Sequence, residues 1–224
     1  MLAIPGSLME IIRNIYFTMK TYSLYYSVSE SSYSLFDEYD ETNLQLLPSD
    51  AERIWSITTK SFEIACLKEH EFLGWEPYKP LIIDEEDLFK LLPEDKYDID
   101  NFQLLQNLGY PIVEAVLFQL FEWIQDMNWP VAQEIAPFLA LGGDSIIPHV
   151  KKILKSDDGI WKYWTLNFVM DEVPISVLKN IKKELEYLIE NKTDKDIREE
   201  VDILAKKLLK KINQGEALKS HVTD

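Results

Sequence analysis

The chain has 224 residues, of which 46% are hydrophobic, and its formal net charge is −16. The single cysteine, Cys66, excludes an intramolecular disulfide, and one thiol with three dispersed histidines cannot form a zinc site. No run approaches the roughly 18 uninterrupted apolar residues of a membrane helix, and the parts of a signal peptide are not found in order. We therefore expect a cytoplasmic protein with no cofactor and no membrane partner.

The acidic residues are concentrated in the first half of the chain. Residues 1–110 contain 20 acidic and 8 basic residues, whereas residues 111–224 contain 19 and 15. A negative surface repels nucleic acid and anionic membranes at long range and speeds association with basic partners. Solubility alone explains the same charge equally well, so both interpretations stay open.

The N-terminal part of the chain has two competing periodicities. From Ser7 to Val28 apolar residues recur at helical spacing, while Tyr22, Leu24 and Tyr26 alternate as they would in a strand. We favour a helix for this segment. The following residues 29–43 are rich in Ser, Tyr, Asp and Glu, and this composition predicts an exposed connection.

Two further helices are expected before the middle of the chain. Ser49 or Asp50 is placed to cap a helix with its apolar face between Ile54 and Leu67. A connector containing Gly and Pro follows this helix. Residues 84–90 then predict one short helix before a proline stops it.

The second half of the chain predicts six successive helices joined by short connections. A polar residue followed three positions later by a large apolar one recurs at Asp126–Trp129, Asp158–Trp161 and, more weakly, Asp194–Ile197, with spacings of 32 and 36 residues. Because one helical hairpin cannot bury its own apolar face, such hairpins must stack and form a concave groove. The expected helices cover residues 111–124, 128–141, 146–154, 160–170, 175–189 and 194–212.

Four strings stand out in this half and just before it: WIQDMNWPVA at 123–132, LPEDKYD at 92–98, SDDGIWKYW at 156–164 and EEVD at 199–202. They resemble a bacterial domain family of unknown function with HEAT-like helical hairpins. The resemblance covers about residues 90–212 and implies a fold, since it brings no activity, cofactor or catalytic residue. By analogy, some small acidic proteins built of helical repeats are immunity partners of secreted toxins.

These observations together predict an all-α protein. We expect a HEAT-like α-solenoid of stacked antiparallel hairpins at residues 90–224, preceded by an acidic, mainly helical region at residues 1–89.

Trp and Asp residues are the most conspicuous side chains of the repeated segments. Buried Trp side chains either fill a core or dominate an interface. We assign Trp129 and Trp161, at the repeated position, to core packing, and keep Trp123 and Trp164 as candidate binding residues. The acids and amide before the expected helices are interpreted as helix caps, not as catalytic groups: Asp126, Asn128, Asp157, Asp158 and Asp194.

The leading functional hypothesis is a non-catalytic module that binds a basic protein, plausibly a toxin, through acidic residues and exposed Trp side chains. We find no motif for a nucleophile, phosphate loop or metal site. His149 is interpreted as a packing residue and Cys66 as a small core residue. The candidate partner-binding residues are Asp37, Glu38, Asp40, Glu41, Asp84, Glu85, Glu86, Asp87, Trp123 and Trp164.

Two alternative functions remain at this stage. A lysine stripe on successive helices is a feature of helical-repeat proteins that bind nucleic acid, although lysine is also the usual solvated residue of an amphipathic helix. Exposed tyrosines favour a structural protein that assembles with itself, and the oligomeric state stays open. The lysines are Lys151, Lys152, Lys155, Lys179, Lys182 and Lys183, and the tyrosines are Tyr22, Tyr25, Tyr26 and Tyr33.

Overall fold

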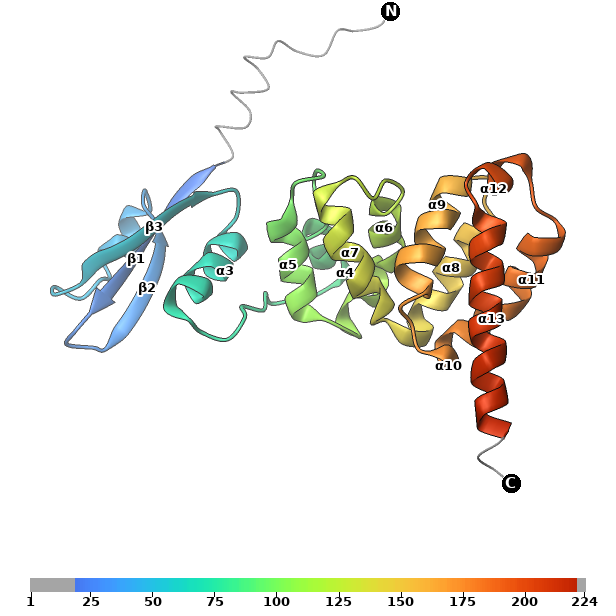
Figure 1. The fold of residues 1–224 in the computed structure, drawn as a ribbon. Helices are drawn as coiled ribbons and strands as arrows, with labels where there is room; N and C mark the ends of the chain where they lie inside the picture. The colour runs from blue at the N-terminus through green and yellow to red at the C-terminus, as the bar shows by residue number, and fades with distance from the viewer. Residues whose placement is uncertain (1–18, 221–224) are drawn as a thin grey trace, which may run out of the picture. The chain divides into compact units, whose positions relative to one another are not determined.

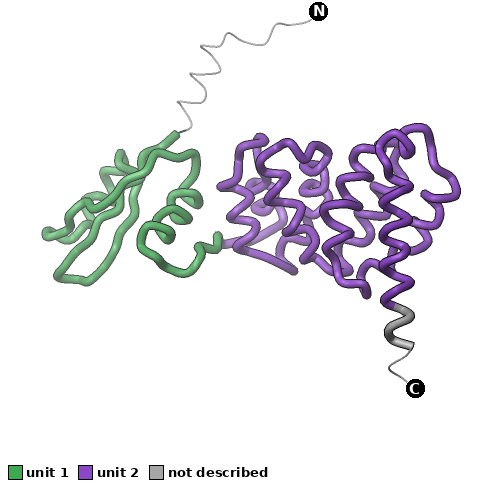
Figure 2. Tube along the Cα trace, viewed as in Figure 1, with its two compact units in different colours: residues 1–80 green, residues 81–224 purple. Residues whose placement is uncertain are grey.

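The computed structural model describes residues 19–220, with side chains as far as residue 215. The chain forms two compact units, residues 1–80 and residues 81–224 (Figures 1 and 2). The boundary at Pro80 falls inside the predicted Gly- and Pro-containing connector, whereas the predicted domains were divided between residues 89 and 90. Each unit is described separately below.

Unit 1 contains a three-stranded antiparallel sheet, so the prediction of an all-α solenoid is wrong and the fold is mixed α/β (Figure 1). The central strand lies between the other two in the order β2-β1-β3. Tyr22 of the central strand pairs with Asp37 on one side and with Ile57 on the other. The strands are β1 (Lys20–Ser27), β2 (Ser32–Asp37) and β3 (Glu52–Thr59).

Sequence periodicity explains why β1 is a strand where we predicted a helix. Tyr22 and Leu24 are buried, as the alternation of period two requires, and Ser23 between them is also buried. The neighbours on both edges of β1 satisfy its backbone, and α3 (Phe62–Leu73) packs against β1 and β3. The remainder of the predicted N-terminal helix, residues 7–18, lies outside the described residues.

One predicted helix of unit 1 is divided between a strand and a helix. The segment 54–67 belongs to β3 and then to α3 (Phe62–Leu73), and α2 (Glu41–Leu44) lies between β2 and β3. Ser61 ends the extended segment and caps α3 by accepting a hydrogen bond from the Ile64 N–H. Gly74 closes α3 with φ of +66°, a conformation that favours glycine.

The regular elements of unit 2 within residues 81–220 are all helices (Figure 1). All six helices predicted for this half have counterparts, several of them broken into two shorter segments, whereas α5 was not predicted. The helices are α4 (Glu85–Lys90), α5 (Ile99–Leu108), η1 (Ile112–Val116), α6 (Leu117–Trp123), α7 (Pro130–Ala140), η2 (Gly143–Ile146), α8 (Ile147–Leu154), α9 (Gly159–Trp164), the π-helix η3 (Thr165–Met170), α10 (Ile175–Leu178), η4 (Lys179–Ile181), α11 (Lys182–Glu190), α12 (Asp194–Arg198) and α13 (Val201–Ser220).

The core of unit 2 joins helices that are distant in the sequence. Phe102 of α5 packs edge-on against Phe138 of α7, with 5.5 Å between the ring centroids. Phe121 of α6 and Ile135 of α7 are fully buried, and α13 packs along α11. This core holds α9 and α12 side by side at one end of the unit (Figure 1). Among the described helices, none combines the length and apolar character needed to cross a membrane.

Candidate functional site

A buried ion pair joins α9 to α12. The Lys162 ammonium lies 2.9 Å from a carboxylate oxygen of Asp196, and the two side chains are 5% and 2% exposed. Charges so well removed from water are tolerated only when they are paired and hydrogen-bonded. The pair therefore fixes the position of α12 against α9.

Thr193 provides the remaining partners of the Asp196 carboxylate. Its N–H and its hydroxyl both donate to Asp196 Oδ2, at 3.1 and 2.8 Å, while the Asp196 N–H donates back to Thr193 Oγ1. This reciprocal arrangement is a capping box, here closed by Asp. Burial raises the pKa of Asp196, but the hydrogen bonds from Lys162 and Thr193 outweigh burial and hold that pKa below its ordinary value.

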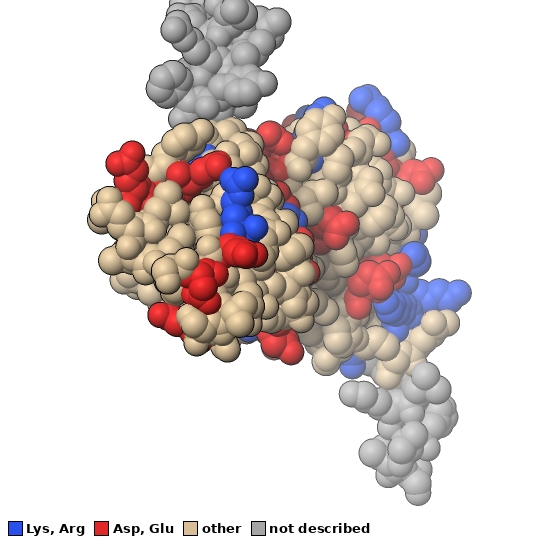
Figure 3. All heavy atoms as spheres, turned by 90° about the vertical axis from the view of Figure 1, so that its left-hand side faces the viewer, with Lys and Arg blue, Asp and Glu red and all other residues tan. Residues whose placement is uncertain are grey.

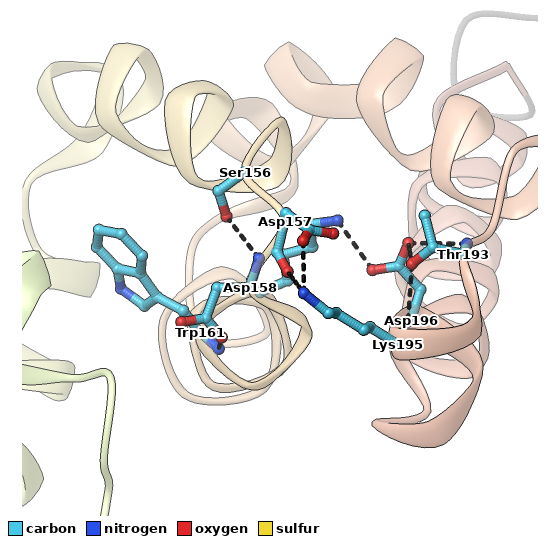
Figure 4. Close-up of polar contacts among 8 residues, drawn as sticks. Ser156, Asp157, Asp158, Trp161, Thr193, Lys195 and Asp196 are labelled. Carbon is cyan, nitrogen blue, oxygen red and sulfur yellow. Dashed lines mark hydrogen bonds and ion pairs between the residues drawn. The ribbon is translucent and has the colours of Figure 1, made fainter.

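A second, exposed ion pair connects the loop before α9 to α12. Lys195 Nζ lies 2.5 Å from Asp157 Oδ2 and also donates to the Asp157 carbonyl (Figure 4). Asp158 caps α9 by accepting a hydrogen bond from the Trp161 N–H at 2.9 Å, and Ser156 accepts from the Asp158 N–H. Ser156, Asp157 and Asp158 thus fix the conformation of the loop before α9 and its contact with α12.

Gly159 permits the close approach of the two helices. A Cβ atom at this position would lie 3.0 Å from the Lys195 carbonyl oxygen and 3.1 Å from Cγ of Glu199. Backbone atoms cannot move aside as a flexible side chain can, so a larger residue would separate α9 from α12.

Two adjoining cavities of about 300 and 290 Å³ open between α9 and α12, and we call them together the α9–α12 groove. Ile160, Arg198 and Glu199 line both cavities. The first cavity also has an aromatic wall, in which the rings of Tyr163 and Trp164 meet edge-on at 4.8 Å. The remaining lining residues are Asp157, Asp158, Gly159, Lys195 and Glu200.

The structure places the two candidate Trp residues in different settings. Trp164 is half-buried and lines the α9–α12 groove. Trp123, also half-buried, packs edge-on against Trp129 with 5.6 Å between ring centroids. Trp161 donates from Nε1 to the Phe121 carbonyl at 2.9 Å, which ties α9 to α6. Trp164 therefore lies beside a cavity.

The first group of candidate acids belongs to unit 1. Asp37 of β2 pairs with Lys20 of β1 at 2.9 Å, and Glu38, which follows β2, pairs with Arg53 of β3 at 3.0 Å. Both acids therefore form ion pairs with residues of other strands. Asp40 caps α2 through the Asn43 N–H, and Glu41 is the first residue of that helix. Surface pairs of this kind contribute little to stability.

The second group of candidate acids lies on α4 in unit 2. Asp84 caps the helix, and Asp87 accepts a hydrogen bond from the Ile83 N–H and pairs with Lys90 at 2.9 Å. Glu85 and Glu86 are exposed, and their side chains make no direct hydrogen bond or ion pair to any residue that the structure describes, although the charge of Glu86 contributes to the raised pKa of Lys90. Of these four acids, Asp84 and Asp87 therefore interact with other residues of unit 2 through their carboxylates.

The candidate lysines have several different environments. Lys151 pairs with Glu184 at 3.4 Å, and Lys152 places its ammonium 3.5 Å above the centre of the Phe118 ring. Lys179 and Lys182 also interact with other residues of the fold. Lys155 and Lys183 line a surface hollow of about 390 Å³ between α8 and α11 together with Leu154, Glu184 and Tyr187.

Of the five residues interpreted as caps, only Asp158 is an N-cap. Asp126 instead closes a turn before α7 by accepting from the Asn128 N–H, and Asp194 follows the true cap. Among residues 19–220, no three His, Cys, Asp or Glu side chains are grouped in a way that could hold a metal ion.

The residues that sequence reasoning missed are the last residue of α12 and the two residues that follow it. Arg198, Glu199 and Glu200 meet the aromatic wall of α9 only in the folded structure. The one available signal was the string EEVD, which was noted for its resemblance and not for a site.

Comparison with known families identifies the helical unit. Residues 91–209 match the model of a domain of unknown function, DUF5071. The match agrees with the resemblance to a family of unknown function expected at about residues 90–212. No curated protein matches the chain.

Proposed function

This chain belongs to the DUF5071 family, and we propose that it is a non-catalytic module that binds a basic protein partner. The observation that carries the proposal is the exposed surface of α4. Glu85 and Glu86 project there without an ion pair in the described structure, and the apolar side chains of Ile83 and Phe89 beside them are 81% and 42% exposed.

This combination of charges and apolar groups suits a protein interface. Exposed apolar side chains contribute contact area, and the surrounding charges select the sign of the partner. Two unpaired carboxylates attract a basic surface without having to break an existing ion pair first. A partner with basic residues around an apolar centre would be complementary to α4.

The charge of unit 1 supports the same proposal. Acidic side chains outnumber basic ones on the face of unit 1 turned toward the viewer in Figure 3. Such a surface raises the local concentration of a basic protein and accelerates its association in a way that depends on salt. The charge of unit 1 would thus accelerate association with the partner, and α4 would form the contact surface.

The test is affinity capture with the intact protein from its native cells, followed by stopped-flow association with the purified partner. We expect a basic partner whose association slows about tenfold or more in the variant Glu85→Lys/Glu86→Lys, with a weaker salt dependence. The matched control is Glu186→Lys/Glu190→Lys on α11, since both residues are exposed and the charge change is identical. Association unaffected by the α4 variant, or slowed equally by both, would contradict the proposal.

Neutralisation of a toxin is the form of this activity that we propose, by analogy with small acidic immunity proteins. Binding in the cytoplasm would cover the active surface of a basic toxin. Co-expression of the captured partner with and without this protein tests the idea. We expect cell growth to fail with the partner alone and to recover with the wild-type protein, but not with Glu85→Lys/Glu86→Lys. A partner without toxicity would exclude the immunity role and leave the binding function intact.

A further inference from the structure

We propose that the α9–α12 groove receives a lysine or arginine side chain of the basic partner. This inference rests on the proposed function but concerns a surface separate from α4. The groove combines an aromatic wall, unpaired carboxylates and a rigid base.

The charge of the lining favours a cationic ligand. Four carboxylates line the groove against two cations. One of the cations, Lys195, is already paired with Asp157. The side-chain carboxylates of Glu199 and Glu200 have no hydrogen bond or ion pair among the described residues, and both residues line the same cavity as the aromatic wall. A ligand cation would therefore meet carboxylates that no neighbour neutralises directly.

The aromatic wall favours the same class of ligand. Trp164 is held from one side by Tyr163 and from the other by Phe168, at centroid distances of 4.8 and 5.5 Å. An indole attracts ammonium and guanidinium groups more strongly than other aromatic side chains do. Ile160, which is 46% exposed, offers apolar surface for the methylene groups of the incoming side chain.

The backbone at Glu200 has a conformation that is unusual for glutamate. Its φ is +59°, in the left-handed region where a residue other than glycine is strained. Glycine would suit this turn between α12 and α13, as it does at Gly74 after α3. Glutamate at a position that favours glycine keeps a carboxylate at the groove at a cost in stability. Strain of this kind is concentrated at binding sites.

The base of the groove is rigid. The buried pair Lys162–Asp196 and the exposed pair Asp157–Lys195 both hold α12 against α9 and the loop before it. A preformed groove loses less conformational entropy when a ligand binds. The site is therefore arranged before the partner arrives.

Arg198 is the internal competitor for the site. It lines both cavities, is exposed, and has no ion pair among the described residues. Its guanidinium is the same kind of group that we propose as the ligand. Removing it should leave the carboxylates open, so that Arg198→Ala should bind a cationic peptide more tightly.

The experiment uses the intact protein and an acetylated, amidated tetra-arginine peptide, monitored by NMR of the Trp indole N–H groups. Trp164→Phe identifies the Trp164 resonance. We expect the peptide to shift this resonance, Glu199→Gln/Glu200→Gln to weaken binding about fivefold, and Arg198→Ala to strengthen it about threefold. Glu186→Gln/Glu190→Gln on α11 changes the net charge equally, lies outside both proposed binding surfaces and should alter the affinity less than twofold.

Two outcomes would overturn the proposal: an unshifted Trp164 resonance, or equal weakening by both double variants, which would show attraction by net charge only. Failure here is distinguishable from failure of the proposed function. Loss of partner capture in the α4 variant with an unshifted Trp164 resonance would keep the binding function and remove the groove. A shifted resonance without any captured basic partner would keep the cation site and remove the proposed function.

Discussion

The ammonium of Lys162 lies 2.9 Å from the carboxylate of Asp196, and the two side chains are among the few buried charges of the described structure. Replacing one member of such a pair leaves an uncompensated charge in the protein interior. We expect Lys162→Met to reduce the free energy of unfolding by about 3–5 kcal/mol. Urea unfolding followed by Trp fluorescence measures this loss, because four of the six Trp residues lie in unit 2.

Two control variants test whether the loss of stability in Lys162→Met comes from leaving a buried charge unpaired. Lys195→Met breaks the exposed pair with Asp157 and should cost no more than about 1 kcal/mol. Lys162→Met/Asp196→Asn removes the charge that would be left alone, and should recover part of the stability lost in Lys162→Met. Equal losses in Lys162→Met and Lys195→Met would contradict the assigned role.

Gly159 is expected to be intolerant of alanine although alanine favours helices. The added methyl group would lie 3.0 Å from the Lys195 carbonyl oxygen, so α12 would have to shift. We expect Gly159→Ala to destabilise unit 2 by about 1–3 kcal/mol, the usual cost of overpacking. Thermal unfolding monitored by circular dichroism measures the change. Increased stability, as helix propensity alone predicts, would show that α9 and α12 are not in close contact.

Glu200→Gly should stabilise unit 2, whereas Gly159→Ala should destabilise it. Glycine relieves the left-handed strain at φ of +59°, and the net gain after the added flexibility of the unfolded chain is about 0.5–1 kcal/mol. Glu200→Ala is the matched variant, since it also removes the carboxylate but keeps the strain. A gain in Glu200→Ala equal to that in Glu200→Gly would attribute the effect to charge and not to the backbone.

The helical unit was largely predictable because its signals are local. The Asp84 and Asp158 caps, and Thr193 at the start of α12, act on N–H groups two or three residues away. The sheet depends on distant partners, since Leu24 pairs with Leu35 and with Trp55. The alternation at Tyr22 to Tyr26 was visible, but nothing local indicates that a strand will find neighbours on both edges.

The α9–α12 groove was also hard to predict, because it depends on residues that are distant in the sequence. Trp164 was a candidate because a Trp near a repeated motif is conspicuous by itself. Glu199 and Glu200 look like ordinary solvated acids of a helix end, and they become notable only beside α9. The closure of α12 onto α9 depends on a buried pair between residues 162 and 196, which no spacing rule predicts.

His149 should make the stability of unit 2 depend on pH. It packs near Phe118 and Phe121, and burial, assisted by the charge of Lys152, lowers its pKa below the ordinary value of 6.5. The folded protein therefore binds this proton less readily than the unfolded chain. The contribution of His149 is complete above pH 6.5 and is lost as the pH falls from 6.5 toward the folded pKa.

The measurement is urea unfolding between pH 7.5 and 5.5 for the wild type and for His149→Gln, which cannot take up the proton. We expect stability to decline more steeply in the wild type below pH 6.5. His70→Gln in unit 1 is the control and should keep the wild-type slope for unit 2. The same slope in all three proteins would mean that His149 is equally easy to protonate in both states.

The reactivity of the Cys66 thiol reports on the packing of unit 1. It is 7% exposed on α3, and burial, together with the nearby charge of Glu69, raises the pKa of its thiol to about 12. Since only the thiolate reacts, Ellman's reagent at pH 8 should modify native Cys66 about three orders of magnitude more slowly than an ordinary thiol. Reaction will then proceed through opening of unit 1, so Leu24→Ala, which removes a fully buried side chain of β1, should accelerate it. Rapid modification of the wild-type protein would show that α3 does not stay closed over the sheet.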